Sequence, residues 1–213
     1  MHEIKACVKQ FRNNQIDVIE TNNTFTQKLT HMVPYPFYIQ QTHFDGQSYT
    51  KGSVVDTYSE FGCACKEFAE LSFSEAKQPT TRNWPGGDGL EVYVPDVARL
   101  KEFDVDAEFI IVGDASMSDE AGTSDAQRRR RSFLQFLYGR NAGAVGSRLA
   151  IFDAHSNLGY KDVTVKKVSP VESHRQEYGN VALYVFRVTF SVFDPVTEVT
   201  PVFNNGIITS LDW

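Results

Sequence analysis

Two cysteines one residue apart, Cys63 and Cys65, are the first candidates for chemistry in the sequence. A structural zinc site needs four ligands that converge tetrahedrally, as two such pairs or as one pair with two spaced histidines. The only other cysteine is Cys7, and no pair of histidines has a suitable spacing. We therefore predict no metal site at this pair, and expect half-buried, reduced thiols instead.

The histidines suggest one further arrangement. Asp153 and His155, together with His174, could form the two-histidine, one-carboxylate site that binds non-haem iron on a β-sandwich. In the usual enzyme pattern the carboxylate follows the first histidine by two residues, whereas here the aspartate precedes it. A turn aspartate beside a surface histidine accounts for the same residues. The iron site is kept as the enzymatic alternative.

Glycine-rich segments occur twice, and neither has the context of a phosphate-binding loop. Residues 86–89 follow Trp84-Pro85 and precede a predicted strand, and residues 139–146 follow a predicted helix. A phosphate-binding loop instead leads into a helix N-terminus. The sequence also lacks a Gly-x-Ser-x-Gly elbow and a catalytic Cys–His spacing. We expect no catalytic residues and no cofactor.

Four consecutive arginines, Arg128 to Arg131, form the sharpest local charge. Four consecutive helical residues sweep about 300° around the axis, so they cannot all face one ligand. They are expected to form a solvated face, or to pair across a subunit boundary with acidic residues such as Asp114, Asp119 and Glu120. The candidate subunit-interface residues are Trp84, Arg128, Arg129, Arg130, Arg131, Arg187 and Phe193.

Composition narrows the class of protein. The chain has 213 residues and a formal net charge of −6, with 41% hydrophobic and 13% aromatic residues. These values exclude intrinsic disorder and coiled coil as the overall class, and the negative net charge argues against sequence-independent electrostatic binding to nucleic acid. No apolar run is long enough to span a membrane, and the first ten residues lack a signal-peptide core. Three cysteines suit a reducing compartment.

The first hundred residues are typical of strands and turns. Residues 15–20 and 25–30 flank an asparagine-containing turn and predict one hairpin, and Asp45-Gly46 predicts a second between residues 36–39 and 54–58. Residues 66–75 fit a strand better than a helix. Residues 77–89 predict a loop, because glycine and proline are dense there, and residues 90–94 predict a strand.

The second half of the chain contains the clearest elements. Residues 104–112 predict a strand with Val105, Ala107, Phe109 and Ile111 on one face. Residues 114–124 predict an exposed loop. The one convincing helix is expected at about residues 125–138, with Ser124 or Asp125 as its N-cap and Gly139 at its C-terminal end. Further strands are expected at residues 149–153 and 160–168.

The segment Val181–Phe193 predicts the strongest strand, which would measure about 43 Å. A strand of this length either bends between two sheets or extends past its own core onto a neighbouring molecule. The segment 197–213 favours β structure and is expected to dock on the body. The predicted fold is mainly β: an antiparallel β-sandwich with one principal flanking helix and extended loops or hairpins. We expect a single domain over residues 1–213, with residues 1–60 as a candidate N-terminal hairpin or arm region.

The order of features from Lys66 onward follows a familiar pattern. A strand leads into Trp84-Pro85-Gly86-Gly87-Asp88-Gly89 and the strand end Tyr93-Val94-Pro95. Then come Phe109–Gly113, the arginine-rich helix with Phe133-Leu134-x-Phe136-Leu137, the strand 149–153, and Val185-Phe186-Arg187-Val188-Thr189-Phe190-x-x-x-Asp194-Pro195. This series resembles tailed-phage and prophage tail proteins of the distal tail (baseplate hub) type, over roughly residues 60–200.

The resemblance implies a β-sandwich subunit of a ring around the tail lumen, with no catalytic role and without the family's additional C-terminal domain. It implies a hexameric ring of identical copies that contacts the tail tube, hub and tape-measure proteins, with no specific nucleic-acid binding and no membrane. The expected location is the virion tail, and the cytoplasm of the bacterial host during assembly. A tail tube or tail terminator subunit is the alternative within this class. A jelly-roll-like metal-dependent enzyme or ligand-binding protein is the alternative outside it.

Overall fold

The computed structural model describes residues 36–69, 74–83, 85, 88–89, 91–113, 119–174 and 183–213. The described chain is mainly β, which confirms the predicted fold class. Its main element is a seven-stranded, fully antiparallel sheet in the order β2-β1-β7-β8-β9-β6-β3. The strands are β1 (Phe37–Phe44), β2 (Tyr49–Asp56), β3 (Cys63–Phe68), β6 (Phe103–Val112), β7 (Arg148–Asp153), β8 (Leu158–His174) and β9 (Leu183–Val192).

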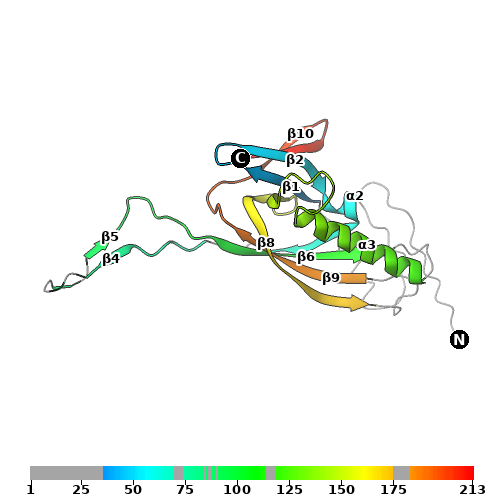
Figure 1. Cartoon of the computed structure of the whole chain (residues 1–213), viewed down its shortest axis with the longest axis horizontal. Helices are drawn as coiled ribbons and strands as arrows, with labels where there is room; N and C mark the ends of the chain where they lie inside the picture. Colours follow the sequence, from blue (N-terminus) through cyan, green and yellow to red (C-terminus); the bar gives the residue numbers. More distant parts are fainter. Residues whose placement is uncertain are drawn as a thin grey trace.

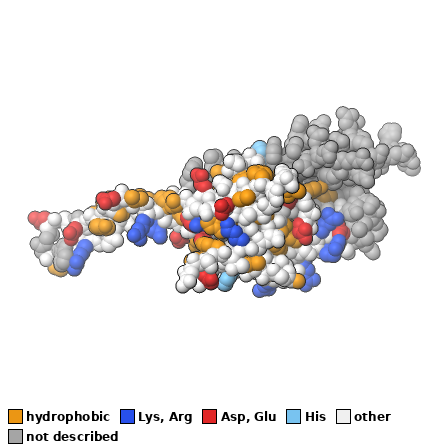
Figure 2. Space-filling view, turned by 90° about the horizontal axis from the view of Figure 1, so that it is seen from above, with side chains coloured by type: hydrophobic (Ala, Val, Ile, Leu, Met, Phe, Trp, Pro, Cys, Tyr) orange, Lys and Arg blue, Asp and Glu red, His pale blue; other side chains and the backbone are white. Residues whose placement is uncertain are grey.

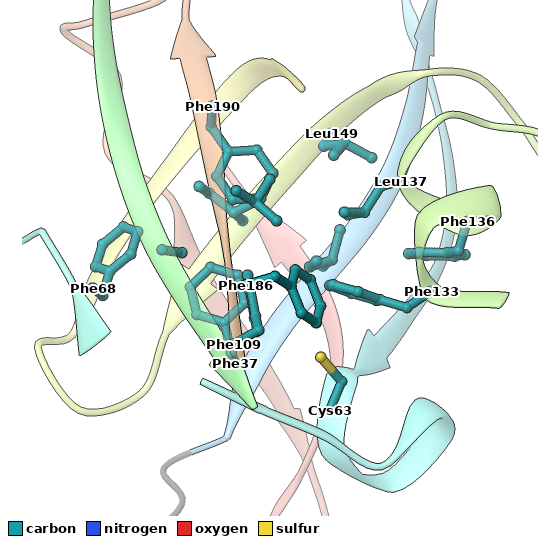
Figure 3. Close-up of a cluster of buried hydrophobic side chains, with 14 of the residues drawn as sticks. Phe37, Cys63, Phe68, Phe109, Phe133, Phe136, Leu137, Leu149, Phe186 and Phe190 are labelled. Atoms are coloured by element: carbon teal, nitrogen blue, oxygen red, sulfur yellow. The ribbon is translucent and has the colours of Figure 1, made fainter. Parts of the chain in front are cut away.

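The sheet folds over itself, as in a β-sandwich. Strands β1 and β6 are four positions apart in the sheet, which would separate them by about 19 Å if the sheet were flat. The ring centroids of Phe37 on β1 and Phe109 on β6 nevertheless lie 5.4 Å apart, and Phe37 also packs against Phe68 of β3. The half formed by β2, β1 and β7 therefore faces the half formed by β9, β6 and β3, as the inward-pointing rings of Figure 3 show.

The core fills the space between these halves and is closed by helix α3 (Asp119–Leu137). Phe133 on α3 lies 5.1 Å from the ring of Phe109 and 6.1 Å from that of Phe186 on β9. The four residues that the sequence assigned to the inner face of β6, from Val105 to Ile111, are all buried. Figure 1 shows α3 lying across the strands of the lower half.

Helix α3 confirms the predicted helix but begins earlier. It starts at Asp119, so the loop predicted for residues 114–124 is wrong for residues 119–124, and residues 114–118 lie outside the described part. Ser124 and Asp125 are inside the helix and are not its N-cap. The predicted end is confirmed, because Gly139 has a positive φ of 63° and its N–H donates to the carbonyl of Phe136.

A two-stranded hairpin covers the outer face of the β2-β1-β7 half. Its strands are β10 (Thr200–Asn204) and β11 (Ile207–Asp212). Leu211 is fully buried with Val199 against Ala150 and Phe152 of β7. The C-terminal Trp213 lies under the Lys51 ammonium, 3.5 Å from its ring centroid. The prediction that the C-terminal segment docks on the body is confirmed.

The hairpin predicted at Asp45-Gly46 is also confirmed, as the β1–β2 pair. Its returning strand ends at Asp56, two residues short of the predicted arm, because the Asp56 side chain caps the short helix α2 (Thr57–Phe61). Residues 37–56, which the sequence placed in a candidate arm region, thus form two strands of the main sheet. The hairpin predicted at residues 15–30 lies outside the described residues.

Strand β9 corrects the expectation drawn from its length. It is bordered on one side by β8 and on the other by β6, each paired along its whole length within the same chain. The alternative in which this strand extends onto a neighbouring molecule is therefore wrong. The strand predicted at residues 160–168 is confirmed within β8, which is longer at both ends. The strand predicted at residues 149–153 is confirmed as β7.

Candidate functional site

A long β-hairpin arm projects from one end of the body (Figure 1). Strands β3 and β6 pair inside the sheet, and the segment that joins them continues outward as a ribbon. At its base the Lys101 N–H donates to the Glu75 carbonyl over 2.7 Å, and the Lys101 ammonium pairs with the Glu75 carboxylate over 2.9 Å. Further out the Lys77 N–H donates to the Arg99 carbonyl. The arm is thus an extension of two strands of the main sheet.

The outer part of the arm contains its own pair of strands. Strand β4 (Thr80–Arg82) pairs with β5 (Glu91–Tyr93) in register from Thr80 opposite Tyr93 to Arg82 opposite Glu91. The loop predicted over residues 77–89 is therefore wrong at β4. The strand predicted at residues 90–94 is confirmed at Glu91–Tyr93.

Large apolar side chains on the arm are exposed to water. Tyr93 and Val94 are each 70% exposed, Val97 is 78% exposed and Val92 is 45% exposed. Figure 2 shows hydrophobic side chains along the arm among acidic and basic ones. A two-stranded ribbon has no interior in which to bury such residues, so the arm carries apolar surface that the described body does not cover.

The predicted interface residues lie in different parts of the molecule. Arg128 and Arg129 lie three and four residues after Asp125 on α3, about one helical turn away, and both pair with its buried carboxylate, over 2.6 Å and 2.7 Å. Arg130 and Arg131 are exposed on the same helix. Arg187 on β9 pairs with Glu108 over 3.1 Å. Phe193 is 55% exposed just after β9, and Trp84 lies outside the described residues. The structure does not bring this set together, and its interface role stays a prediction.

The residues of the enzymatic alternative are also far apart in the fold. Asp153 pairs with Leu158 at the first residue of β8, whereas His174 is the last residue of that 17-residue strand. The Asp153 carboxylate accepts hydrogen bonds from the backbone N–H and the hydroxyl of Ser156, over 2.9 Å and 2.7 Å. It is the turn aspartate that the simpler interpretation predicted. Among the described residues, no three His, Cys, Asp or Glu side chains gather as metal ligands.

Cys63 and Cys65 lie two residues apart on β3, so both point to the face that packs against the core. Cys63 is buried in the core and Cys65 is partly buried, both as free thiols. Burial raises the pKa of both thiols well above the usual value. Neutral thiols are poor nucleophiles and poor metal ligands. No helix in the described part of the chain is long and apolar enough to cross a membrane.

The fold therefore defines a mainly β protein with a folded antiparallel sheet, one long helix and a protruding hairpin arm. No protein-family model matches the chain, and no curated protein matches it. Among solved structures, it is similar to the Dit protein (gp 19.1) of SPP1, described as a paradigm of the hub adsorption apparatus in phages that infect Gram-positive bacteria. The sequence identity is 17% and the TM-score is 0.43, over 77% of this chain and 52% of the SPP1 chain. The chain thus spans about half the length of that structure.

Proposed function

We propose that this protein is a non-catalytic structural subunit that assembles with copies of itself through the arm. The exposed apolar residues of the arm carry this proposal. Burying apolar surface is worth about 25 cal/mol per Å². A two-stranded ribbon alone in water is marginally stable at best. A partner that covers Tyr93, Val94 and Val97 buries this apolar surface and stabilises the two-stranded ribbon.

The identity of the assembly comes from the sequence pattern. The series from Lys66 to Pro195 resembles distal tail proteins, and its segment Tyr93-Val94-Pro95 belongs to the arm between β3 and β6. We place the protein in a tail of a phage or prophage, as a ring of about six copies between the tail tube and the tail tip, where it would contact tube, hub and tape-measure proteins. It would be found in the virion and, during assembly, in the host cytoplasm. A tube or terminator subunit remains the alternative within this class.

Mass measurement in solution tests the assembly. In the variant, Lys77–Arg99 is replaced by Asn-Gly, because Ala76 faces Leu100 across the ribbon and a two-residue turn can join them. Light scattering and negative-stain electron microscopy should show rings for the full chain and monomers for the variant. Circular dichroism should show that the variant keeps a mainly β, cooperatively unfolding body, because the removed segment contributes nothing to the described core.

A second variant keeps the arm and changes only its surface. The double variant Tyr93→Thr with Val97→Thr leaves the ribbon backbone in place and removes apolar area. The protein concentration at which half of the chains are assembled should therefore rise about ten-fold or more. A full chain that stays monomeric at high concentration would refute the proposal. An armless variant that still forms the same rings would also refute it.

A further inference from the structure

A cleft of about 680 Å³ opens between the edge of the sheet and the C-terminal half of α3. One wall is strand β2, through Gly52, Ser53 and Val55. The opposite wall is α3, through Ser132 and Gln135, and Phe61 of α2 lies between the walls. The volume falls in the range of roughly 300–1,000 Å³ that ligand sites occupy. The proposed function of the protein has so far assigned no role to this cleft.

Strand β2 is an edge of the main sheet. Among the described residues it pairs with β1 alone. Lys51, Gly52 and Ser53 are consecutive and all line the cleft. Gly52 and Ser53 both lie opposite Gln41, where the β1–β2 register shifts, and the Gly52 carbonyl accepts a hydrogen bond from the Gln40 side chain over 2.6 Å. Apart from that carbonyl, the outer N–H and C=O groups of β2 pair with no other strand of the described chain.

The floor of the cleft is held rigidly. The Gln41 side chain is buried, and its Nε2 donates to the Phe136 carbonyl over 2.7 Å and to Asn141 Oδ1 over 2.8 Å. Its Oε1 accepts from the Val145 N–H over 3.3 Å. These bonds tie β1 to the end of α3 and to the loop that follows. The two walls are thus fixed before a ligand arrives, which lowers the entropic cost of binding.

An edge strand facing a helix across a groove accommodates an extended polypeptide, which adds to the sheet as one more strand. Besides β3 at the far end of the sheet, the other edge in the described part of the chain is β8 beyond its pairing with β7, from Thr164 onward. That edge has register shifts after Val165 and Pro170, and it carries Lys166 and Lys167. Bulges, proline and lysine are features that block strand addition. The β2 edge also has a register shift, at Gly52 and Ser53, and carries Lys51, so what favours β2 as the receptor is the cleft beside it.

We propose that this cleft receives the arm of a second copy, which adds β4 or β5 to the edge of β2; the inference rests on the proposed arm-mediated assembly. The arm is already extended and, within the described part of the chain, β4 pairs only with β5. It leaves the body at one end, away from its own α3 and β2 (Figure 1). The ten residues from Ala76 to Pro85, when extended, span about 30 Å, enough to reach a neighbour. Both the arm and the cleft rim, with Glu60 and Arg140, carry charges of both signs.

Cross-linking between two full-length copies tests the contact. One copy carries Ser53→Cys on β2 and the other carries Thr81→Cys on β4, and both positions are exposed. Both copies also carry Cys7→Ser, which removes one of the three native thiols. A disulfide forms only when the two Cβ atoms approach to about 4 Å. Mild oxidation should link the mixed copies into heterodimers, whereas Lys167→Cys on β8 mixed with Thr81→Cys should give about ten-fold less product. Equal linkage at β2 and β8, or linkage at β8 alone, would overturn the inference.

Filling the cleft is the second test. Ser132→Trp places a large side chain on the α3 wall, and Ser124→Trp places the same side chain on an exposed position of that helix outside the cleft. Light scattering should show that Ser132→Trp weakens assembly by about ten-fold or more, and that Ser124→Trp does not. Assembly that requires the arm but is unaffected by Ser132→Trp would overturn this inference alone. A full chain that never assembles would overturn the proposed function as well.

Discussion

The carboxylates on the outer face of β6 illustrate how single residues stabilise this sheet. Asp104 accepts a hydrogen bond from the Ser191 hydroxyl over 2.7 Å, and Asp106 accepts one from Thr189 over 2.6 Å. Glu108, only 5% exposed, lies between the ammonium of Lys66 and the guanidinium of Arg187. The β6–β9 register places each of these β9 partners directly opposite its carboxylate.

Glu108 gives a prediction about pH. Burial acts to raise the pKa of Glu108, but hydrogen bonds from Lys66 and Arg187 outweigh it, so the pKa is lowered in the folded protein. Stability from a lowered carboxyl pKa is present above the unfolded value of 4.5 and is lost as the pH falls through the folded value. Glu108→Gln should therefore lower the free energy of unfolding by about 1–2 kcal/mol at pH 7, and by less near pH 3.

Urea denaturation at the two pH values measures this difference. Glu102→Gln, at an exposed position just before β6, is the control and should change the free energy of unfolding little at either pH. A loss for Glu108→Gln that is the same at pH 7 and pH 3 would contradict the ionic explanation.

At the scale of elements, prediction succeeded where packing leaves a pattern in the sequence. The inner face of β6 and the apolar residues of α3 repeat with strand and helix periods, because one side of each element faces the core. The first turns of α3 contain small and polar residues without such a period, so the helix start was missed. Strand β4 reads Thr-Thr-Arg and is defined by its pairing with β5. The partners of β9 depend on pairings distant in sequence, which local pattern does not encode.

The end of α3 supplies the prediction at this scale. A Cβ on Gly139 would lie 2.7 Å from the Gly146 carbonyl oxygen and the residue has a positive φ, so Gly139→Ala adds a backbone clash to conformational strain. Gly143 also has a positive φ, but a Cβ there meets nothing within 4 Å. Gly143→Ala should cost about 1 kcal/mol, and Gly139→Ala clearly more, about 2–4 kcal/mol. Thermal denaturation of the two variants compares them, and equal losses would show that the clash is relieved by movement of the 139–146 loop.

At the scale of the whole molecule, the body covers its own strands and the arm does not. The sequence indicated more extended backbone than one fold could cover, and it attributed the excess to the long strand at residues 181–193, to the loop at residues 114–124 and to the loop around Trp84. Strand β9 is covered within its own chain, and the excess lies between β3 and β6, where glycine and proline concealed a paired ribbon. The cleft beside β2 had no sequence signal, because residues from β1, β2, α2, α3 and the following loop form it only after folding.

Arm and cleft are different surfaces of one chain, so their contact is heterologous: each copy donates an arm to one neighbour and receives an arm from another. A copy without an arm can receive but cannot donate, so it ends a growing assembly or leaves a ring open. Adding the armless Lys77–Arg99 variant to full-length protein should therefore convert rings into shorter species as its share rises, and sedimentation velocity measures their sizes. The armless variant that also carries Ser132→Trp can neither donate nor receive, and it should leave the rings intact. If both armless proteins disrupted the rings equally, or neither did, the arm of one copy would not occupy the cleft of the next.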